Sequence, residues 1–211
     1  MAPIDRREQE RARRRQAILD AARAVFAQEG FRRATVDAIA QRAEVAKGTV
    51  YLYFESKEAI LAELVLRALT ELAMQLQAAY DSCSLLHPDQ KLKAMADAYL
   101  AFARNAPDYF WLLNAFSRGA FQDGISAERH DQIVAASEQT LALATQAIND
   151  GMALGLFTPG DARQAACVLW AALNGALALT SHPIRRQAMQ TDTTTLYRAT
   201  FELVLRGLRN G

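Results

Sequence analysis

Residues 31–57 read FRRATVDAIAQRAEVAKGTVYLYFESK, and this stretch decides the fold of the first part of the chain. It predicts a helix from Thr35 to about Ala43, a turn of three to four residues, and a short helix from about Lys47 to Tyr53. Thr35 is a residue type that caps helices, and Asp37 in the first turn complements the helix dipole. A compact internal face joins the two helices and consists of Ile39, Ala40, Ala43, Val45, Val50 and Phe54. The stretch therefore predicts a helix-turn-helix.

The outward face of the short helix carries polar, small and hydrogen-bonding groups. These residues are Lys47, Gly48, Thr49, Tyr51 and Tyr53. A helix of about two turns fits the major groove of B-DNA, where side-chain donors and thymine methyl groups allow base pairs to be told apart. Gly48 lets the backbone come close to the nucleic acid, and Thr49 offers both a hydroxyl and a methyl group. We therefore expect these residues to contact DNA.

The residues that flank the short helix suit phosphate groups. The helix that Thr35 begins and the long helix that Ser56 begins both present free N–H groups and a positive dipole end, which together form an anion site. The Thr35 and Ser56 hydroxyls, together with Lys57, would complete two phosphate clamps that fix the register of the protein on DNA. The alternative at this point is a helical hairpin whose polar surface has no partner.

A family resemblance favours the DNA-binding interpretation. The segments AILDAARAVFAQEGFRRAT (residues 17–35) and TVDAIAQRAEVAKGTVYLYFESKEAIL (residues 35–61) resemble the DNA-binding domain of the TetR family of bacterial regulators. The resemblance covers about residues 15–65 and implies a homodimeric regulator of about nine helices, usually a repressor. It also implies DNA contacts for Thr35, Lys47, Thr49, Tyr51, Tyr53 and Lys57, and internal positions for Val50 and Phe54.

One residue departs from the family pattern. Glu44 occupies a turn position where the family usually has glycine. If this residue adopts a left-handed backbone conformation, the side chain costs about 1 kcal/mol there. The departure leaves the fine placement of the short helix open, but not its identity.

Beyond this stretch, the apolar residues follow helical spacing and no alternating segment predicts a strand. We expect an all-α fold of about nine helices, with a DNA-binding domain at residues 1–57 and an effector-binding and dimerisation domain at residues 58–211. Capping residues and prolines mark the other helices. They are expected from Arg11 to Gln28, from Ser56 to Tyr80, from near Pro88, from near Pro107, from Ser126 to about Gly151–Gly155, from a capping box at Thr158–Asp161 to Thr180, and from Thr193 to Arg209.

Charge is distributed unevenly along this chain of net charge +1. Residues 1–57 hold 12 Lys and Arg against 8 Asp and Glu, whereas residues 58–211 hold 12 against 15. Six arginines form a basic arm, and we expect its cluster at residues 11–15 to precede the first helix or to form its first turn: Arg6, Arg7, Arg11, Arg13, Arg14 and Arg15. Such an arm attracts phosphates, and in some relatives a similar extension enters the minor groove. A solvated tail without a partner is the alternative.

The last two predicted helices carry broad apolar strips. The resemblance implies that these helices form a four-helix bundle with those of a second copy, and the less favoured alternative is that both strips complete the core of a single chain. A pocket for a small apolar or aromatic effector is expected among the fourth to eighth helices. Asn114 and Asn174 stand out there, because an amide on an apolar helix face needs a partner. The candidate effector contacts are Tyr99, Phe102, Phe110, Trp111, Asn114, Phe116, Trp170 and Asn174, although many of the aromatic residues would serve a core equally well.

Several classes of site find no support in the sequence. The cysteines Cys83 and Cys167 have no paired spacing, Cys167 suits an apolar core, and the histidines are scattered, so no metal site is expected. We find no cofactor-binding loop or nucleophile motif, and therefore expect no enzyme. The charged start of the chain and the lack of a long apolar run predict a cytoplasmic protein without a membrane span. The remaining alternatives are a regulator gated by a protein partner, an ungated regulator, and an activator.

Overall fold

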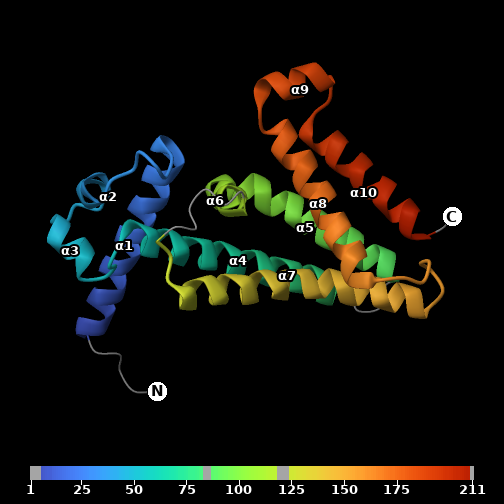
Figure 1. Ribbon diagram of the computed structural model, residues 1–211, viewed down its shortest axis with the longest axis horizontal. Helices are drawn as coiled ribbons and strands as arrows, with labels where there is room; N and C mark the ends of the chain where they lie inside the picture. Colours follow the sequence, from blue (N-terminus) through green and yellow to red (C-terminus); the bar gives the residue numbers. More distant parts are fainter. Residues whose placement is uncertain (1–5, 83–86, 118–123, 210–211) are drawn as a thin grey trace. The chain divides into compact units, whose positions relative to one another are not determined.

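The computed structural model describes residues 6–82, 87–117 and 124–209, and within them every regular element is a helix (Figure 1). Cys83 lies outside the described residues. The expected all-α fold of about nine helices is confirmed, and ten helices are present in the described part. They are α1 (Arg6–Glu29), α2 (Val36–Arg42), α3 (Lys47–Tyr51), α4 (Lys57–Ser82), α5 (Pro88–Asn105), α6 (Pro107–Ser117), α7 (Ala127–Ala153), α8 (Ala162–Thr180), α9 (Pro183–Met189) and α10 (Thr193–Arg209).

Two expected helix starts need correction, and one helix is additional to those expected. Helix α1 begins at Arg6, so the cluster Arg11–Arg15 lies within the helix and not before it or in its first turn. Helix α8 is capped by Asp161, whose carboxylate accepts a 3.0 Å hydrogen bond from the Gln164 backbone N–H, and the expected capping box at Thr158 is wrong. Helix α9 was not expected at all, although its first residue is a proline, which suits that position.

The described chain forms two compact units. Unit 1 comprises the described residues within 1–68 and 108–133, and unit 2 comprises those within 69–107 and 134–211. Helices α4 and α7 each continue without a break from one unit into the other. The domain boundary between residues 57 and 58 stays a prediction.

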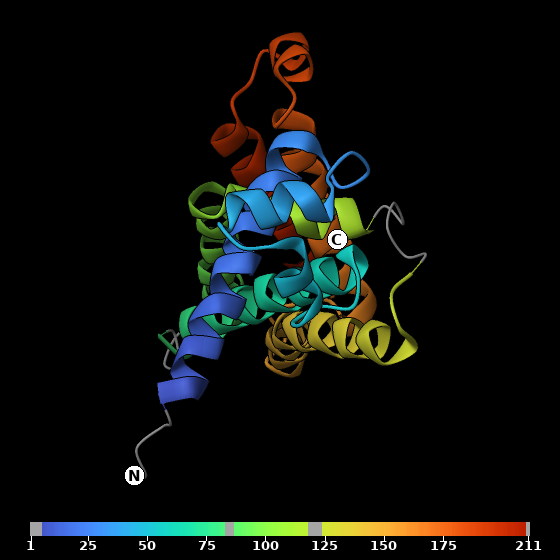
Figure 2. The same cartoon turned by 90° about the vertical axis from the view of Figure 1, so that its left-hand side faces the viewer.

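In unit 1, helices α1, α2 and α3 pack in sequence, and Figure 2 shows α2 crossing α1. The core contains Ile18, Leu19 and Phe26 from α1, each with no exposed surface. The Phe26 ring meets the Phe31 ring edge-on, with the ring centroids 5.3 Å apart. These contacts fix the turn between α1 and α2, and so the position from which the helix-turn-helix begins.

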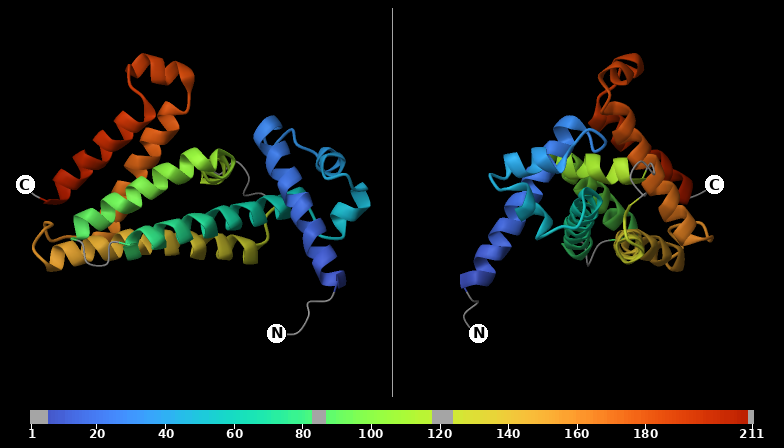
Figure 3. Two further views of the ribbon diagram at one scale, coloured as in Figure 1. Left: turned by 180° about the vertical axis from the view of Figure 1, so that it is seen from behind. Right: turned by 60° about the vertical axis from the view of Figure 1, so that its left-hand side comes forward.

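In unit 2, helices α8 and α10 lie side by side and α9 joins their ends (Figure 3). Tyr197 of α10 is buried, and its hydroxyl donates a 2.7 Å hydrogen bond to the Ala96 carbonyl of α5. Cys167 is exposed, so the expectation that it belongs to the core is wrong. Among the described helices, α8 alone is long and apolar enough to cross a membrane by length and composition, and 33% of that segment is buried inside the protein.

Candidate nucleic-acid interface

The helix-turn-helix is built from α2, the turn after it, and α3. The Thr35 hydroxyl accepts a 3.1 Å hydrogen bond from the Ala38 backbone N–H, which confirms Thr35 as the cap of α2. Val50 and Phe54 are 1% and 6% exposed, so the prediction that they face inward is confirmed. Burying such a side chain contributes about 1.5–3 kcal/mol, and this anchors α3 against the rest of unit 1.

The turn before α3 has the backbone conformation that glycine would favour. Glu44 has φ of +54°, in the left-handed region. Glu44 therefore adopts the left-handed conformation considered above. Its side chain costs about 1 kcal/mol of stability in that conformation. The turn nevertheless closes, because the Val45 backbone N–H donates a 3.0 Å hydrogen bond to the Ala40 carbonyl.

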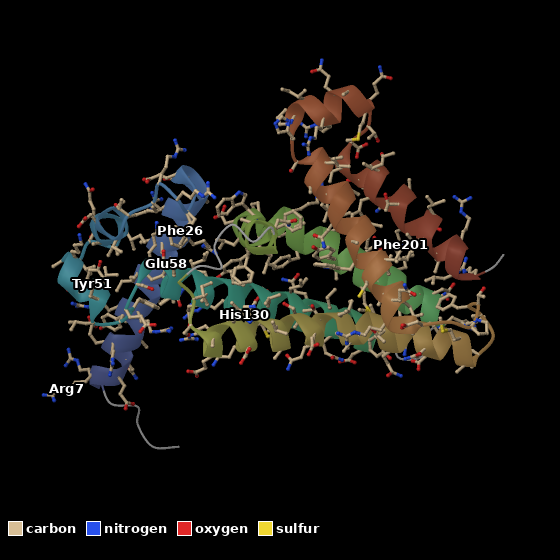
Figure 4. The ribbon with its side chains drawn as sticks, in the orientation of Figure 1. Arg7, Phe26, Tyr51, Glu58, His130 and Phe201 are labelled. Carbon is tan, nitrogen blue, oxygen red and sulfur yellow. The ribbon has the colours of Figure 1, made fainter. Side chains whose placement is uncertain are left out.

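The opposite face of α3 is open. Lys47 and Gly48 are exposed, and the Tyr51 side chain, labelled in Figure 4, is 49% exposed. Thr49 and Tyr53 are half-buried, and Tyr53 lies after the end of the helix. One further residue of this surface was not expected from the sequence: Leu52, which is 77% exposed. Its spacing of four residues from Gly48 is the signal that could have identified it.

Lys47 is held by a neighbour within the helix-turn-helix. Its ammonium group donates a 2.8 Å hydrogen bond to the Asp37 carboxylate in the first turn of α2. The hydrogen bond and the negative charge of Asp37 raise the pKa of Lys47 above its ordinary value. Lys47 therefore remains positively charged, and an exposed ion pair links the start of α3 to the first turn of α2.

Gly48 is not required by the packing of the chain. A Cβ atom added there would have no atom within 4 Å, and the residue lies in a helix where other residues stabilise more. The same helical position would be about 0.5–1 kcal/mol more stable with alanine. The surface over Gly48 is therefore free for another molecule to approach the backbone.

The two expected phosphate clamps contain the required groups. These groups differ in how many hydrogen-bond donors they have left for a phosphate. The Ser56 hydroxyl accepts a 3.0 Å hydrogen bond from the Ala59 backbone N–H, as Thr35 does in α2, and each hydroxyl keeps its own proton to donate. Lys57 instead donates two hydrogen bonds of 2.9 Å, to the carbonyls of Phe31 and Ala34. Its ammonium also lies 4.4 Å from the centre of the Phe31 ring. Two of its three N–H groups are thus used within the protein.

A carboxylate joins three helices of unit 1. Glu63 of α4 accepts a 3.0 Å hydrogen bond from Arg15 of α1, and lies 3.4 Å from both Arg67 and Arg129. Burial raises the pKa of Glu63, but the bond from Arg15 and the charges of Arg129 and Arg67 outweigh it and leave the pKa lowered. The Arg15 guanidinium also lies 4.9 Å from the centre of the Phe54 ring. Arg15 therefore belongs to the structure of unit 1 and not to a basic arm.

The residues expected to bind an effector fall into both units. Phe110, Trp111, Asn114 and Phe116 belong to α6 in unit 1, and Tyr99, Phe102, Trp170 and Asn174 belong to unit 2. Phe102 and Tyr99 are buried, whereas Trp111 and Trp170 are exposed. A groove of about 610 Å³ is present over α9, and none of the eight residues lines it.

Both amides that the sequence singled out have partners inside the protein. The Asn114 amide donates a 3.0 Å hydrogen bond to the Phe110 carbonyl, one turn earlier in α6. The Asn174 amide oxygen accepts a 2.6 Å hydrogen bond from the Tyr99 hydroxyl, and its nitrogen donates to the Trp170 carbonyl at 3.2 Å. Burial raises the pKa of Tyr99, which keeps this hydroxyl protonated. Each amide thus has a partner within the protein, so the need for a partner does not by itself point to a ligand.

Two family models match the chain. One, described as bacterial regulatory proteins of the tetR family, matches residues 18–64, and the other, described as a tetracyclin repressor-like C-terminal domain, matches residues 92–206. The chain belongs to the TetR family. This family consists of DNA-binding transcriptional regulators and not of enzymes. Within the described part of this TetR-family chain, no three His, Cys, Asp or Glu side chains gather to hold a metal ion.

The relatives share parts of the sequence and most of the fold. The fatty acid metabolism regulator protein of Bacillus subtilis (strain 168) is 51% identical over 47 residues, which are 22% of this chain and 24% of that protein. The chain spans less than half the length of the curated relatives it matches. A tetR-family regulatory protein from Rhodococcus RHA1 is 21% identical with a TM-score of 0.77, covering 94% of this chain and 98% of that one. The regulator FadR from Bacillus subtilis, solved with stearoyl-CoA, is 21% identical with a TM-score of 0.72, covering 92% and 98%.

Proposed function

We propose that this TetR-family chain is a cytoplasmic, homodimeric repressor that a small apolar or aromatic effector releases from an inverted-repeat operator. One observation carries the proposal. The inner side of α3 is anchored by the buried Val50, whereas its outer side presents Lys47, Gly48 and Tyr51 to solvent. A short helix anchored in this way is suited to enter the major groove.

The surroundings of α3 support binding to phosphates. The hydroxyls of Thr35 and Ser56 lie at the N-termini of α2 and α4, where the helix dipole favours anions. Exposed arginines of α1 add positive charge, and because they lie on a helix about 10–12 Å wide they suit phosphates better than a minor groove about 6 Å wide. The predicted DNA contacts are Thr35, Lys47, Gly48, Thr49, Tyr51, Tyr53, Ser56 and Lys57.

The apolar surface of α8 and α10 supports a dimer through these two helices. Each helix buries one side within unit 2, but Val168, Trp170 and Leu203 remain 55%, 51% and 65% exposed. A second copy would cover these side chains. It would also hold the two α3 helices of the dimer at the separation that the two half-sites of an inverted repeat require. Contact with a second copy would also explain why α8 is apolar, so that no membrane is needed to explain it.

Gating by an effector would act through continuous helices. Helix α4 begins beside the helix-turn-helix and runs on into unit 2, so an effector that favours one setting of α4 would alter the spacing of the two α3 helices. Coupling of about 1–3 kcal/mol would change operator affinity about 5- to 150-fold. The neighbour that binds stearoyl-CoA makes acyl-CoA esters a sensible part of an effector screen.

A second candidate is a regulator gated by a protein partner, or not gated at all. The internal hydrogen bonds of Asn114 and Asn174 are compatible with it, because each amide has a partner without a ligand. An activator remains a further alternative, which transcription measurements distinguish from a repressor.

A gel-shift experiment tests the proposal. The full chain is titrated into DNA that flanks its own gene, at a fixed salt concentration, with and without aromatic compounds and acyl-CoA esters. We expect a shifted band with the stoichiometry of a dimer, and its loss in the presence of an effector. A band that no compound removes favours the ungated regulator, and the absence of any sequence-selective band contradicts the proposed function.

A further inference from the structure

An apolar side chain lies on the outer surface of α3. Leu52 caps the C-terminus of α3 and is 77% exposed, more than any other large apolar residue in the described part of the chain. Single exposed leucines are common on protein surfaces, so exposure alone carries no conclusion. What distinguishes Leu52 is its position beside Tyr51 and one helical turn after Gly48.

The backbone determines where this side chain lies. The Leu52 N–H donates hydrogen bonds to the carbonyls of Gly48 and Thr49, at 3.3 Å and 3.2 Å, so Leu52 still follows the helix. Side chains on a helix tilt toward its N-terminus, and that of Leu52 therefore points toward the turn that contains Gly48. No atom of another side chain, that of Leu52 included, lies within 4 Å of a Cβ atom built on Gly48. The Leu52 side chain and the bare backbone of Gly48 are thus neighbours on the surface of α3 with open space between them, and we call this pair the Leu52–Gly48 notch.

The chemistry of the notch selects one feature of DNA. A leucine side chain has no hydrogen-bonding group, so it cannot bind a phosphate or the donors and acceptors on base edges. The apolar group that base pairs present in the major groove is the 5-methyl group of thymine. We propose that the Leu52–Gly48 notch receives a thymine 5-methyl group and thereby makes Leu52 a specificity-determining residue. This inference rests on the proposed function, since it requires α3 to enter the major groove.

The test removes the methyl group and leaves the base pair unchanged. A duplex is enriched from random-sequence DNA with the full-length wild-type chain, and each of its thymines is replaced in turn by deoxyuridine. Dissociation constants are measured at one salt concentration for the wild type, Leu52→Ala and the control Leu154→Ala. Leu154 is a good match because it is 65% exposed and lies in unit 2, after α7.

For the wild type and for Leu154→Ala, we expect deoxyuridine at one position of each half-site to weaken binding about fourfold, the effect of one methyl-sized contact. Leu52→Ala should bind the thymine duplex more weakly and show no penalty at that position. If Leu52→Ala keeps the wild-type penalty at every thymine, or if the wild type has none, the inference is wrong while the proposed function stands. If no duplex is enriched, both are wrong.

Discussion

The ammonium group of Lys57 donates a 2.9 Å hydrogen bond to the carbonyl oxygen of Ala34. This bond joins the first residue of α4 to the residue before the cap of α2. A shift in the start of α4 would therefore reach the helix-turn-helix directly. Lys57 therefore has a structural role in addition to the phosphate contact that is expected of it.

We expect Lys57→Met to lower the free energy of unfolding by about 1–3 kcal/mol, because two carbonyls lose a charged donor. Methionine keeps the apolar stem of the side chain and removes only the ammonium. Lys93→Met is the control, since Lys93 forms an exposed ion pair with Asp97 within α5, and such pairs contribute about 0–1 kcal/mol. Chemical denaturation measures both variants, and equal effects would contradict the structural role of Lys57.

Glu63→Gln should destabilise the protein by about 1–3 kcal/mol, because it removes the charge that three arginines share. The control is Glu138→Gln, whose partner Arg163 is exposed, and we expect a change below about 1 kcal/mol. Denaturation at pH 7 compares the two variants. A larger effect at Glu138 than at Glu63 would be incompatible with the role assigned to this carboxylate.

Glu63 should also shape the response to acid. Its pKa is lowered in the folded protein below the ordinary value of 4.5. Its contribution to stability is therefore present above pH 4.5 and is lost as the pH falls through the folded pKa. Melting temperatures are measured for the wild type and Glu63→Gln from pH 6 to about pH 3. The two melting temperatures should approach each other as the pH falls. A difference between the two proteins that stays constant with pH would rule this out.

Gly48→Ala should change stability and DNA binding in opposite directions. The added Cβ meets no atom of the chain, so we expect the free energy of unfolding to rise by about 0.5–1 kcal/mol. The same methyl group would stand between α3 and DNA, and should weaken operator binding about tenfold, which corresponds to about 1.4 kcal/mol. Denaturation and binding titrations give the two values, and a stabilised variant with unchanged affinity would show that DNA does not approach this backbone.

Val168→Glu should convert a dimer into monomers, because a charge without a partner in the α8–α10 interface costs about 3 kcal/mol or more. Val134→Glu is the control, as Val134 of α7 is 44% exposed and lies outside that surface. Light scattering during gel filtration measures the mass of each variant. If Val168→Glu remains a dimer with the wild-type affinity, the proposed interface is wrong.

Local chemistry explains which parts of the fold the sequence predicts. Thr35 is recognisable as a cap, and Pro88 and Pro107 as helix starts, because each acts on neighbours within a turn. The spacing of Val50 and Phe54 predicts the inner face of α3 for the same reason.

Features that depend on residues far apart could not be predicted. The cluster around Glu63 needs Arg15 and Arg129, which come together only when α1 and α7 pack on α4. Apolar residues of α8 all follow helical spacing, but only the packed structure separates the buried Leu169 from the exposed Val168. The short helix α9 has no buried residue, so no apolar pattern marks it.

The most direct test of the central claim is the ratio of affinities for the enriched duplex and for a scrambled duplex, measured for the wild type and Tyr51→Ala at equal salt. Tyr51 is exposed on α3, so its removal should cost no core packing. We expect Tyr51→Ala to lose about 1–3 kcal/mol of binding to the enriched duplex, and little to the scrambled one. A ratio equal to that of the wild type would mean that the outer face of α3 does not read DNA.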